Sequence, residues 1–210
     1  MTHKPDTIAF WRGRLPHWEV ADGRYFVTIH LQGAIPSQGQ ERIRALAAEH
    51  ERVNSRDAEA WLKIQRRIYG EMEEWLDRTD YVNHLQRDDI AKMMMEAIMF
   101  RHGKAWNVLE YVIMPSHVHL FFEILEGGLK HGLEQFKSWT GHRAAKLLKC
   151  DGERFWQDEW FDHWSRCDDE DLRIIEYIRQ NPVKAMLVKQ YVDWPYGSWN
   201  NGGIARLVIP

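Results

Sequence analysis

Two segments rich in β-branched and aromatic residues lie almost end to end near the middle of the chain, at residues 105–114 and 117–125. Only Pro115 and Ser116 separate them, so we expect two neighbouring antiparallel strands. A third segment of the same kind, residues 24–32, predicts a strand nearer the N-terminus. The chain is therefore expected to build an antiparallel sheet that its other segments must cover.

The segments between these strands have apolar residues at helical spacing. Residues 41–79 predict two helices, Asp88 or Asp89 to Arg101 one helix, residues 129–149 another, and residues 168–180 a last helix that Asn181 and Pro182 should stop. This order predicts an α+β fold, an antiparallel sheet with helices packed on it. We expect one domain of residues 1–210, with a helical insertion at about 41–101 and an irregular tail at about 192–210.

Composition limits the class of protein. The 210 residues are 44% hydrophobic and 28% charged, which is typical of a globular protein. No apolar run is long enough to cross a membrane, and the N-terminus lacks the apolar core of a secretory signal. Two cysteines cannot build a disulfide framework, so we expect a cytoplasmic protein.

The charges are unevenly distributed along the chain. The net charge of -3 by itself weighs against nucleic-acid binding. Residues 151–177, however, contain ten acidic and three basic side chains, whereas residues 129–149 contain five basic side chains and one acidic. The predicted helix 129–149 can therefore present a basic surface, although a solvated helix face is the simpler interpretation.

His117 and His119 lie two residues apart in a predicted strand, so both imidazoles share one face of the sheet. The residues of the other face are all apolar and should form the core side: Val118, Leu120, Phe122 and Ile124. The two histidines are therefore expected on a half-exposed face. Adjacent imidazoles can bind a divalent metal, although an isolated pair is more often two unrelated surface histidines.

Tyr177 lies at the edge of the apolar stripe of the predicted helix 168–180, and Asn181 follows one turn later on the same side. Each alone has a simple explanation, amphipathic packing for the tyrosine and a helix stop for the asparagine. Together with two histidines they indicate phosphodiester chemistry. That chemistry needs a nucleophilic hydroxyl and a metal that polarises the phosphate.

Several stretches, in the same order along the chain, resemble the single-tyrosine HUH transposases, and most of all the REP-associated tyrosine transposases. They are YVIMPSHVHLFFE at 111–123, FKSWT at 136–140, FWQDEWFDH at 155–163, DEDLRIIEYIRQNPVKAMLV at 169–188, RGRLPHW at 12–18, RYFVTIHL at 24–31 and Asp193-Trp194-Pro195. The resemblance covers most of the chain outside roughly residues 40–100. Two departures are Ser116, where the family has asparagine, and Ser165, where it has an apolar residue.

The resemblance implies a ferredoxin-like antiparallel sheet and a role for each matching residue. His117 and His119 would bind a divalent metal, Mg²⁺ or Mn²⁺, with Asn181 as the third ligand. Tyr177 would be the nucleophile that takes the 5′ phosphate of a cleaved single strand. DNA contacts would fall on Lys137, Thr140 and Arg166.

The implied activity is that of a metal-dependent single-stranded DNA endonuclease and strand transferase, a transposase that acts on hairpin, REP-like DNA. The implied partner is single-stranded or hairpin DNA and not a membrane. The protein would be a monomer or homodimer in the cytoplasm, associated with the nucleoid.

Two other hypotheses stay open at this point. One is a hairpin-DNA-binding protein derived from a transposase that no longer cuts. The other is a metallohydrolase with no DNA role, in which Asp162 and His163 would supply further ligands.

Overall fold

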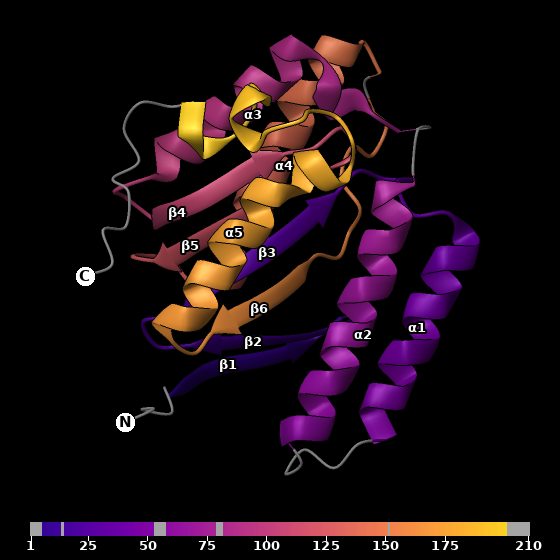
Figure 1. The fold of residues 1–210 in the computed structure, drawn as a ribbon, viewed down its shortest axis with the longest axis vertical. Helices are drawn as coiled ribbons and strands as arrows, with labels where there is room; N and C mark the ends of the chain where they lie inside the picture. Colours follow the sequence, from indigo (N-terminus) through magenta and orange to yellow (C-terminus); the bar gives the residue numbers. More distant parts are fainter. Residues whose placement is uncertain (1–5, 14, 53–57, 79–81, 151, 201–210) are drawn as a thin grey trace.

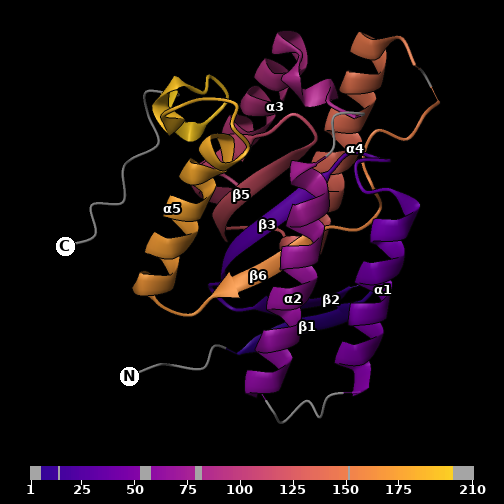
Figure 2. The ribbon, with the colours of Figure 1, turned by 45° about the vertical axis from the view of Figure 1, so that its right-hand side comes forward.

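The computed structural model describes residues 6–13, 15–52, 58–78, 82–150 and 152–200 (Figures 1 and 2). In chain order its elements are β1 (Thr7–Arg12), β2 (Pro16–Val20), β3 (Arg24–His30), α1 (Ser37–Arg52), α2 (Ala58–Asp77), α3 (Asp88–Arg101), β4 (Trp106–Ile113), β5 (His117–Ile124), α4 (Leu129–Leu148), β6 (Phe161–Ser165) and α5 (Asp168–Lys184). Short 3-10 helices lie at His84–Gln86, Tyr191–Asp193 and Ser198–Asn200.

Four strands form the main sheet in the order β4-β5-β3-β6, and every neighbouring pair is antiparallel. Helix α3 connects β3 to β4 and helix α4 connects β5 to β6. Two strand–helix–strand units interleaved in this way make a ferredoxin-like sheet. The predicted α+β fold class is therefore confirmed, including helices packed on the sheet and a helical insertion.

Helices cover both faces of this sheet. On one face, beneath α3 and α4, the ring of Trp106 stacks on Phe122 with centroids 4.5 Å apart and packs against Phe136 of α4 at 5.7 Å. Helix α5 crosses the other face (Figure 1). The prediction of a half-exposed histidine face is therefore wrong: His117 is 1% exposed and His119 is 0% exposed, because α5 and side chains of α2 cover them.

Helices α1 and α2 form an antiparallel pair that is inserted between β3 and α3 (Figure 2). The two helices predicted over residues 41–79 are confirmed. Ile64 and Ile68 of α2 form a small apolar cluster with Leu15, separate from the main core. Because α3 is the crossover that leads to β4, the inserted helices between β3 and β4 are α1 and α2, and α3 belongs to the ferredoxin-like pattern itself.

The strands β1 and β2 pair with each other in a separate two-stranded sheet, and β2 lies against β6. Its buried His17 is held between two acidic side chains of the segment around β6. The side-chain nitrogens of His17 are hydrogen bonded to Asp162 and, at 3.2 Å, to Glu159. These contacts tie the N-terminal ribbon to the main sheet.

The last long helix does not stop where its sequence predicts. Helix α5 continues through Pro182 to Lys184, and the amide of Ala185 donates to the carbonyl of Asn181 at 3.0 Å. The helical hydrogen bonds thus resume directly after the proline, which lacks its own N–H. As a result Asn181 lies within the helix, one turn after Tyr177.

The segment after α5 packs on the sheet as far as it is described. Trp194 is buried, and its indole N–H donates to the carbonyl of Ile113 at 2.9 Å. Residues 192–200 include two short 3-10 turns, and the rest of the predicted tail, 201–210, lies outside the described residues. Within the described ranges, no helix has the length and apolar character needed to cross a membrane.

Candidate active site

The two histidines of β5, His117 and His119, direct their Nε2 atoms toward each other. Their Nε2 atoms lie 3.1 Å apart. The Nδ1 atom of His117 is hydrogen bonded to the hydroxyl of Ser116 (3.0 Å), and that of His119 to the hydroxyl of Thr28 on β3 (2.8 Å). In the tautomer whose Nδ1–H donates to these hydroxyls, both Nε2 lone pairs are free to bind a metal.

Burial keeps both imidazoles neutral. It lowers the pKa of His119 to about 3 and that of His117 well below its usual range, where the neighbouring His119 and His30 lower it further. Neutral imidazole is the form that ligates metals. The pair is therefore ready to bind a cation at neutral pH.

Tyr177 of α5 packs edge-on against His119, one of this pair. Its ring centroid is 5.6 Å from that of His119, and its hydroxyl donates a hydrogen bond to Glu73. The hydroxyl of Tyr69 donates to the Tyr177 oxygen at 2.7 Å. Burial and the charge of Glu73 raise the pKa of Tyr177 well above its usual range, so the phenol is protonated.

Asn181 completes the set that the sequence predicts. Its side chain is buried and lies close enough to His117, His119 and Tyr177 to influence the pKa of each. The spacing of four residues along α5 places the amide and the phenol on one side of the helix. The structure thus brings together all four residues predicted for metal binding and nucleophilic attack.

Sequence reasoning missed two residues of this site, Tyr69 and Glu73, which both come from α2. The Oε2 atom of Glu73 lies 3.7 Å from Nε2 of His119. A signal exists in their spacing, since residues four apart share one face of an amphipathic helix. Nothing in the sequence, however, indicates that α2 packs against the strand of the histidines.

The donor atoms at this point fit a divalent cation. One ligand atom from each of Glu73, His117 and His119 lies within 4.8 Å of the other two. The second oxygen of the glutamate, Oε1, is buried without a hydrogen-bond partner. Two neutral nitrogens with oxygen donors are a set that divalent transition metals accept.

The predicted DNA contacts have different surroundings. Lys137 of α4 is half-buried, donates to the carbonyl of Asp158 and lies 5.1 Å from the ring of Trp160. Burial lowers its pKa to about 8. The guanidinium of Arg166 lies 4.7 Å from the ring of Trp164. Both residues stay predicted DNA contacts.

The structure contradicts Thr140 as a DNA contact. Its side chain is 0% exposed, because it lies on the side of α4 that faces the sheet. Its hydroxyl donates to the carbonyl of Phe136 at 2.6 Å and accepts from the indole N–H of Trp156 at 2.9 Å. The hydroxyl of Thr140 therefore both donates and accepts a hydrogen bond inside the fold.

Asp162 and His163, the ligands proposed for a metallohydrolase, do not join the histidine pair. Asp162 accepts from the indole N–H of Trp160 at 2.9 Å and is hydrogen bonded to His17. His163 is hydrogen bonded to Glu170 at 2.9 Å. Among the residues that the structure describes, the one group suited to a metal is that of Glu73 with His117 and His119.

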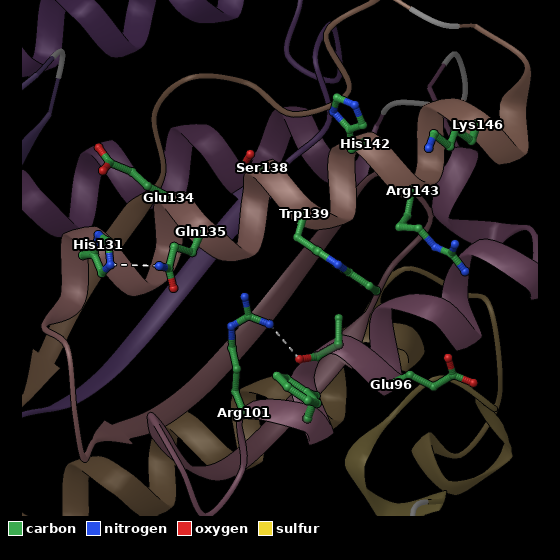
Figure 3. Close-up of a pocket in the computed structure, with 12 residues that line it drawn as sticks. Glu96, Arg101, His131, Glu134, Gln135, Ser138, Trp139, His142, Arg143 and Lys146 are labelled. Atoms are coloured by element: carbon green, nitrogen blue, oxygen red, sulfur yellow. Dashed lines mark hydrogen bonds between the residues drawn. The ribbon is translucent and has the colours of Figure 1, made fainter.

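A separate groove of about 1100 Å³ lies between α3 and α4. Figure 3 shows Trp139 and Arg143 of α4 directed toward α3. Trp139 is 48% exposed, and the guanidinium of Arg143 lies 5.9 Å from its ring. Lys146 also lines the groove, so part of the basic surface predicted for residues 129–149 is present there.

Comparison with known proteins gives a consistent result. No protein-family model matches the chain. A REP-associated tyrosine transposase of Escherichia coli (strain K12) is 26% identical over 121 residues, which is 57% of this chain and 70% of that protein. A putative REP-associated tyrosine transposase of Haemophilus influenzae (strain ATCC 51907 / DSM 11121 / KW20 / Rd) is 27% identical over 134 residues, 58% of this chain and 70% of the relative.

The fold has a solved counterpart as well. The structure of a REP-associated tyrosine transposase bound to a REP hairpin has a TM-score of 0.57 to this chain and 17% sequence identity, and the match covers 97% of this chain and 89% of that one. This likeness shows the fold. The chain resembles the REP-associated tyrosine transposases in its sequence motifs, in its identity to two of them and in its fold.

Proposed function

We propose that this chain is a metal-dependent single-stranded DNA endonuclease and strand transferase. It acts on hairpin, REP-like DNA through a 5′-phosphotyrosine intermediate. One observation carries the proposal: the Nε2 atoms of His117 and His119 lie 3.1 Å apart, the ring of Tyr177 lies 5.6 Å from that of His119, and the buried Asn181 interacts with all three side chains. The names of the relatives and the hairpin bound to the solved counterpart support it.

The reaction is a transesterification at phosphorus. The Tyr177 oxygen attacks the phosphorus of the scissile phosphate, and the bond from phosphorus to the 3′ oxygen breaks. The phenol proton leaves along the hydrogen bond to Glu73, and the departing 3′ oxygen takes up a proton. In the reverse direction a 3′ hydroxyl attacks the phosphotyrosine and restores the tyrosine, so joining needs no external energy source.

His117, His119 and Asn181 would hold Mg²⁺ or Mn²⁺. When bound, such an ion polarises a phosphate oxygen and stabilises the charge that develops on it. The hydroxyls of Ser116 and Thr28 fix the two rings in the orientation that this ligation needs. The serine at the position of the family's asparagine thus still supports the site.

The proposed site is complete within one copy of the chain, because Tyr177 packs against His119 of the same chain. We therefore propose that a single copy can cut, whether the protein is a monomer or a homodimer. Lys137 and Arg166 are the proposed DNA contacts. The proposed location is the cytoplasm, where the protein would associate with the nucleoid.

The test uses hairpin oligonucleotides drawn from repeats that flank the gene, incubated with the protein and Mn²⁺ and run on a denaturing gel. A 3′ label should migrate with the protein and a 5′ label should not, because the tyrosine keeps the 5′ phosphate of the downstream fragment. Tyr177→Phe should form no adduct. Tyr69→Phe, which removes the neighbouring phenol hydroxyl, should still form one, although at an altered rate.

An adduct that persists in Tyr177→Phe would refute this assignment of the nucleophile, and its loss in Tyr69→Phe alone would transfer the role to Tyr69. A native band shift with no adduct under any condition would favour the hairpin-DNA-binding protein that no longer cuts.

A further inference from the structure

The inserted helix α2 reaches into the proposed active site, although it lies outside the ferredoxin-like pattern. The ring of Tyr69 packs edge-on against Phe26 of β3 and against Tyr177, with centroid distances of 5.5 Å and 5.8 Å. Glu73 follows one helical turn later, on the same side of α2. The insertion thus contributes side chains to the surroundings of the histidine pair as well as packing area.

The two carboxylate oxygens of Glu73 have different surroundings. Oε2 accepts the hydrogen bond of the Tyr177 hydroxyl and lies 3.7 Å from Nε2 of His119. Oε1 is buried and has no hydrogen-bond partner. The glutamate side chain is 12% exposed. A buried carboxylate oxygen without a partner is costly, so a site of this kind normally holds a cation or a donor.

Among the described residues, no side chain supplies a hydrogen bond to Oε1 of Glu73. The one basic side chain of these ranges within 4.0 Å of the Glu73 carboxylate is His119, whose Nε2 is itself a proposed ligand of the ion. The ammonium of Lys184 lies instead over the ring of Tyr177, 4.6 Å from its centroid. A divalent metal ion between the histidines and the glutamate would satisfy the unpartnered oxygen and compensate its charge.

We propose that Glu73 is a metal ligand of the active site, supplied by the insertion, which binds the ion through Oε1 while Oε2 holds the hydroxyl of Tyr177. This inference deepens the proposed function and rests on it for the need of a metal. Glu73 would add an anionic oxygen to a ligand set that consists of two neutral histidine nitrogens and the amide of Asn181. Oxygen ligands of this type are those that Mg²⁺ and Mn²⁺ prefer. One carboxylate would then link the nucleophile to the ion.

The experiment measures metal affinity without DNA. Metal-free full-length protein is titrated with Mn²⁺, and free Mn²⁺ is followed by its electron paramagnetic resonance signal. Glu73→Gln, which keeps the shape of the side chain, should bind Mn²⁺ at least about tenfold more weakly than the wild type. Glu74→Gln is the matched control, since Glu74 is the next residue of α2 and forms an exposed ion pair with Arg78. It should leave the affinity unchanged.

Two further variants separate ligation from a structural role. Tyr177→Phe removes the hydrogen bond to Oε2 and should leave Mn²⁺ affinity within about twofold of the wild type, because the ligating oxygen is Oε1. Glu73→Asp restores a carboxylate and should recover part of the affinity lost in Glu73→Gln. This recovery also tests the proposal if Glu73→Gln proves less well folded by circular dichroism.

Unchanged Mn²⁺ affinity in Glu73→Gln, with a clear loss in His119→Ala, would overturn the proposal, and so would a wild-type protein that binds no Mn²⁺. The adduct assay reports separately on the proposed function. If Glu73→Gln binds Mn²⁺ more weakly but the wild type forms no adduct, the proposed function is overturned and Glu73 remains a metal ligand. If the wild type forms an adduct but both proteins bind Mn²⁺ equally well, the proposed function stands and Glu73 is not a ligand.

Discussion

At the scale of single residues, two hydroxyls decide how the histidine pair can act. Thr28 and Ser116 each occupy the Nδ1 side of one ring and leave Nε2 for the proposed metal. We expect Thr28→Val, which has nearly the same shape, to weaken Mn²⁺ binding about 10- to 100-fold, because His119 loses its fixed orientation. Titration of the metal-free protein measures this. An affinity equal to that of the wild type would show that packing alone fixes the ring.

A second residue-scale prediction concerns His17. Burial lowers its pKa, but hydrogen bonds and charges of Asp162 and Glu159 outweigh this and raise it to about 9. A group with a raised pKa stabilises the fold fully below its ordinary value of 6.5, and this stability is lost as the pH rises through about 9. We therefore expect the free energy of unfolding, measured in urea, to decrease between pH 6.5 and pH 9.5.

In His17→Gln this decrease should be much smaller, and at pH 6.5 the variant should be less stable by about 3 kcal/mol, because it leaves the buried Asp162 without its charged partner. Parallel pH profiles for the two proteins would contradict the assignment.

The candidate site was predictable only where a motif carried it. His117, His119, Tyr177 and Asn181 follow from the resemblance and from side-chain spacing, and they meet in space. Glu73 comes from the inserted helix, at the part of the chain where the resemblance ends, so no motif marks it.

Thr140 shows the opposite case, a residue that lies in a matching motif but is buried. It belongs to the matching stretch at 136–140, but a motif does not state which side of a helix faces the sheet. Burial on α4 excludes it from DNA contact.

At the scale of elements, prediction succeeded for strands and helices with long, regular patterns. The strands expected at 24–32, 105–114 and 117–125 form as β3, β4 and β5. The short strands β1, β2 and β6 were not predicted. They have five or six residues each, and the partner that fixes β6, β3, lies far away in the sequence. Period-two alternation is weak evidence in segments that short.

The two sides of α4 give a prediction at this scale. Phe136 is 0% exposed and packs on Trp106, whereas Trp139 on the same helix is 48% exposed. Phe136→Ala should destabilise the protein by about 3–5 kcal/mol through lost burial and a cavity. Trp139→Ala should cost less than about 1 kcal/mol. Urea unfolding of both variants checks this, and similar losses would mean that α4 packs in another orientation.

At the scale of the whole molecule, the sheet separates two surfaces. Tyr177 of α5 and the histidine pair lie on one face of the sheet, which α5 and α2 cover, whereas the groove between α3 and α4 lies on the other face (Figures 1 and 3). The overall charge of -3 conceals the basic character of α4. Because affinity for DNA follows local charge, this second surface can add to the proposed hairpin binding without taking part in the proposed chemistry.

Arg143 and Lys146 test this idea because both line the groove beside the exposed ring of Trp139. If the two side chains contact phosphates of the hairpin, replacing both by glutamate should weaken binding. It should also reduce the slope of log affinity against log salt by about 1.8, since each lost phosphate contact removes about 0.9. Native gel shifts of Tyr177→Phe protein at several salt concentrations measure both quantities without cleavage.

Lys189→Glu is the control, an exposed lysine just after α5 that does not line the groove. It should change the salt slope little. Equal slopes in the double variant and the control would place the hairpin elsewhere on the molecule. In that case the proposed contacts Lys137 and Arg166 would have to supply the electrostatic attraction, and their own substitution by glutamate should then lower the slope.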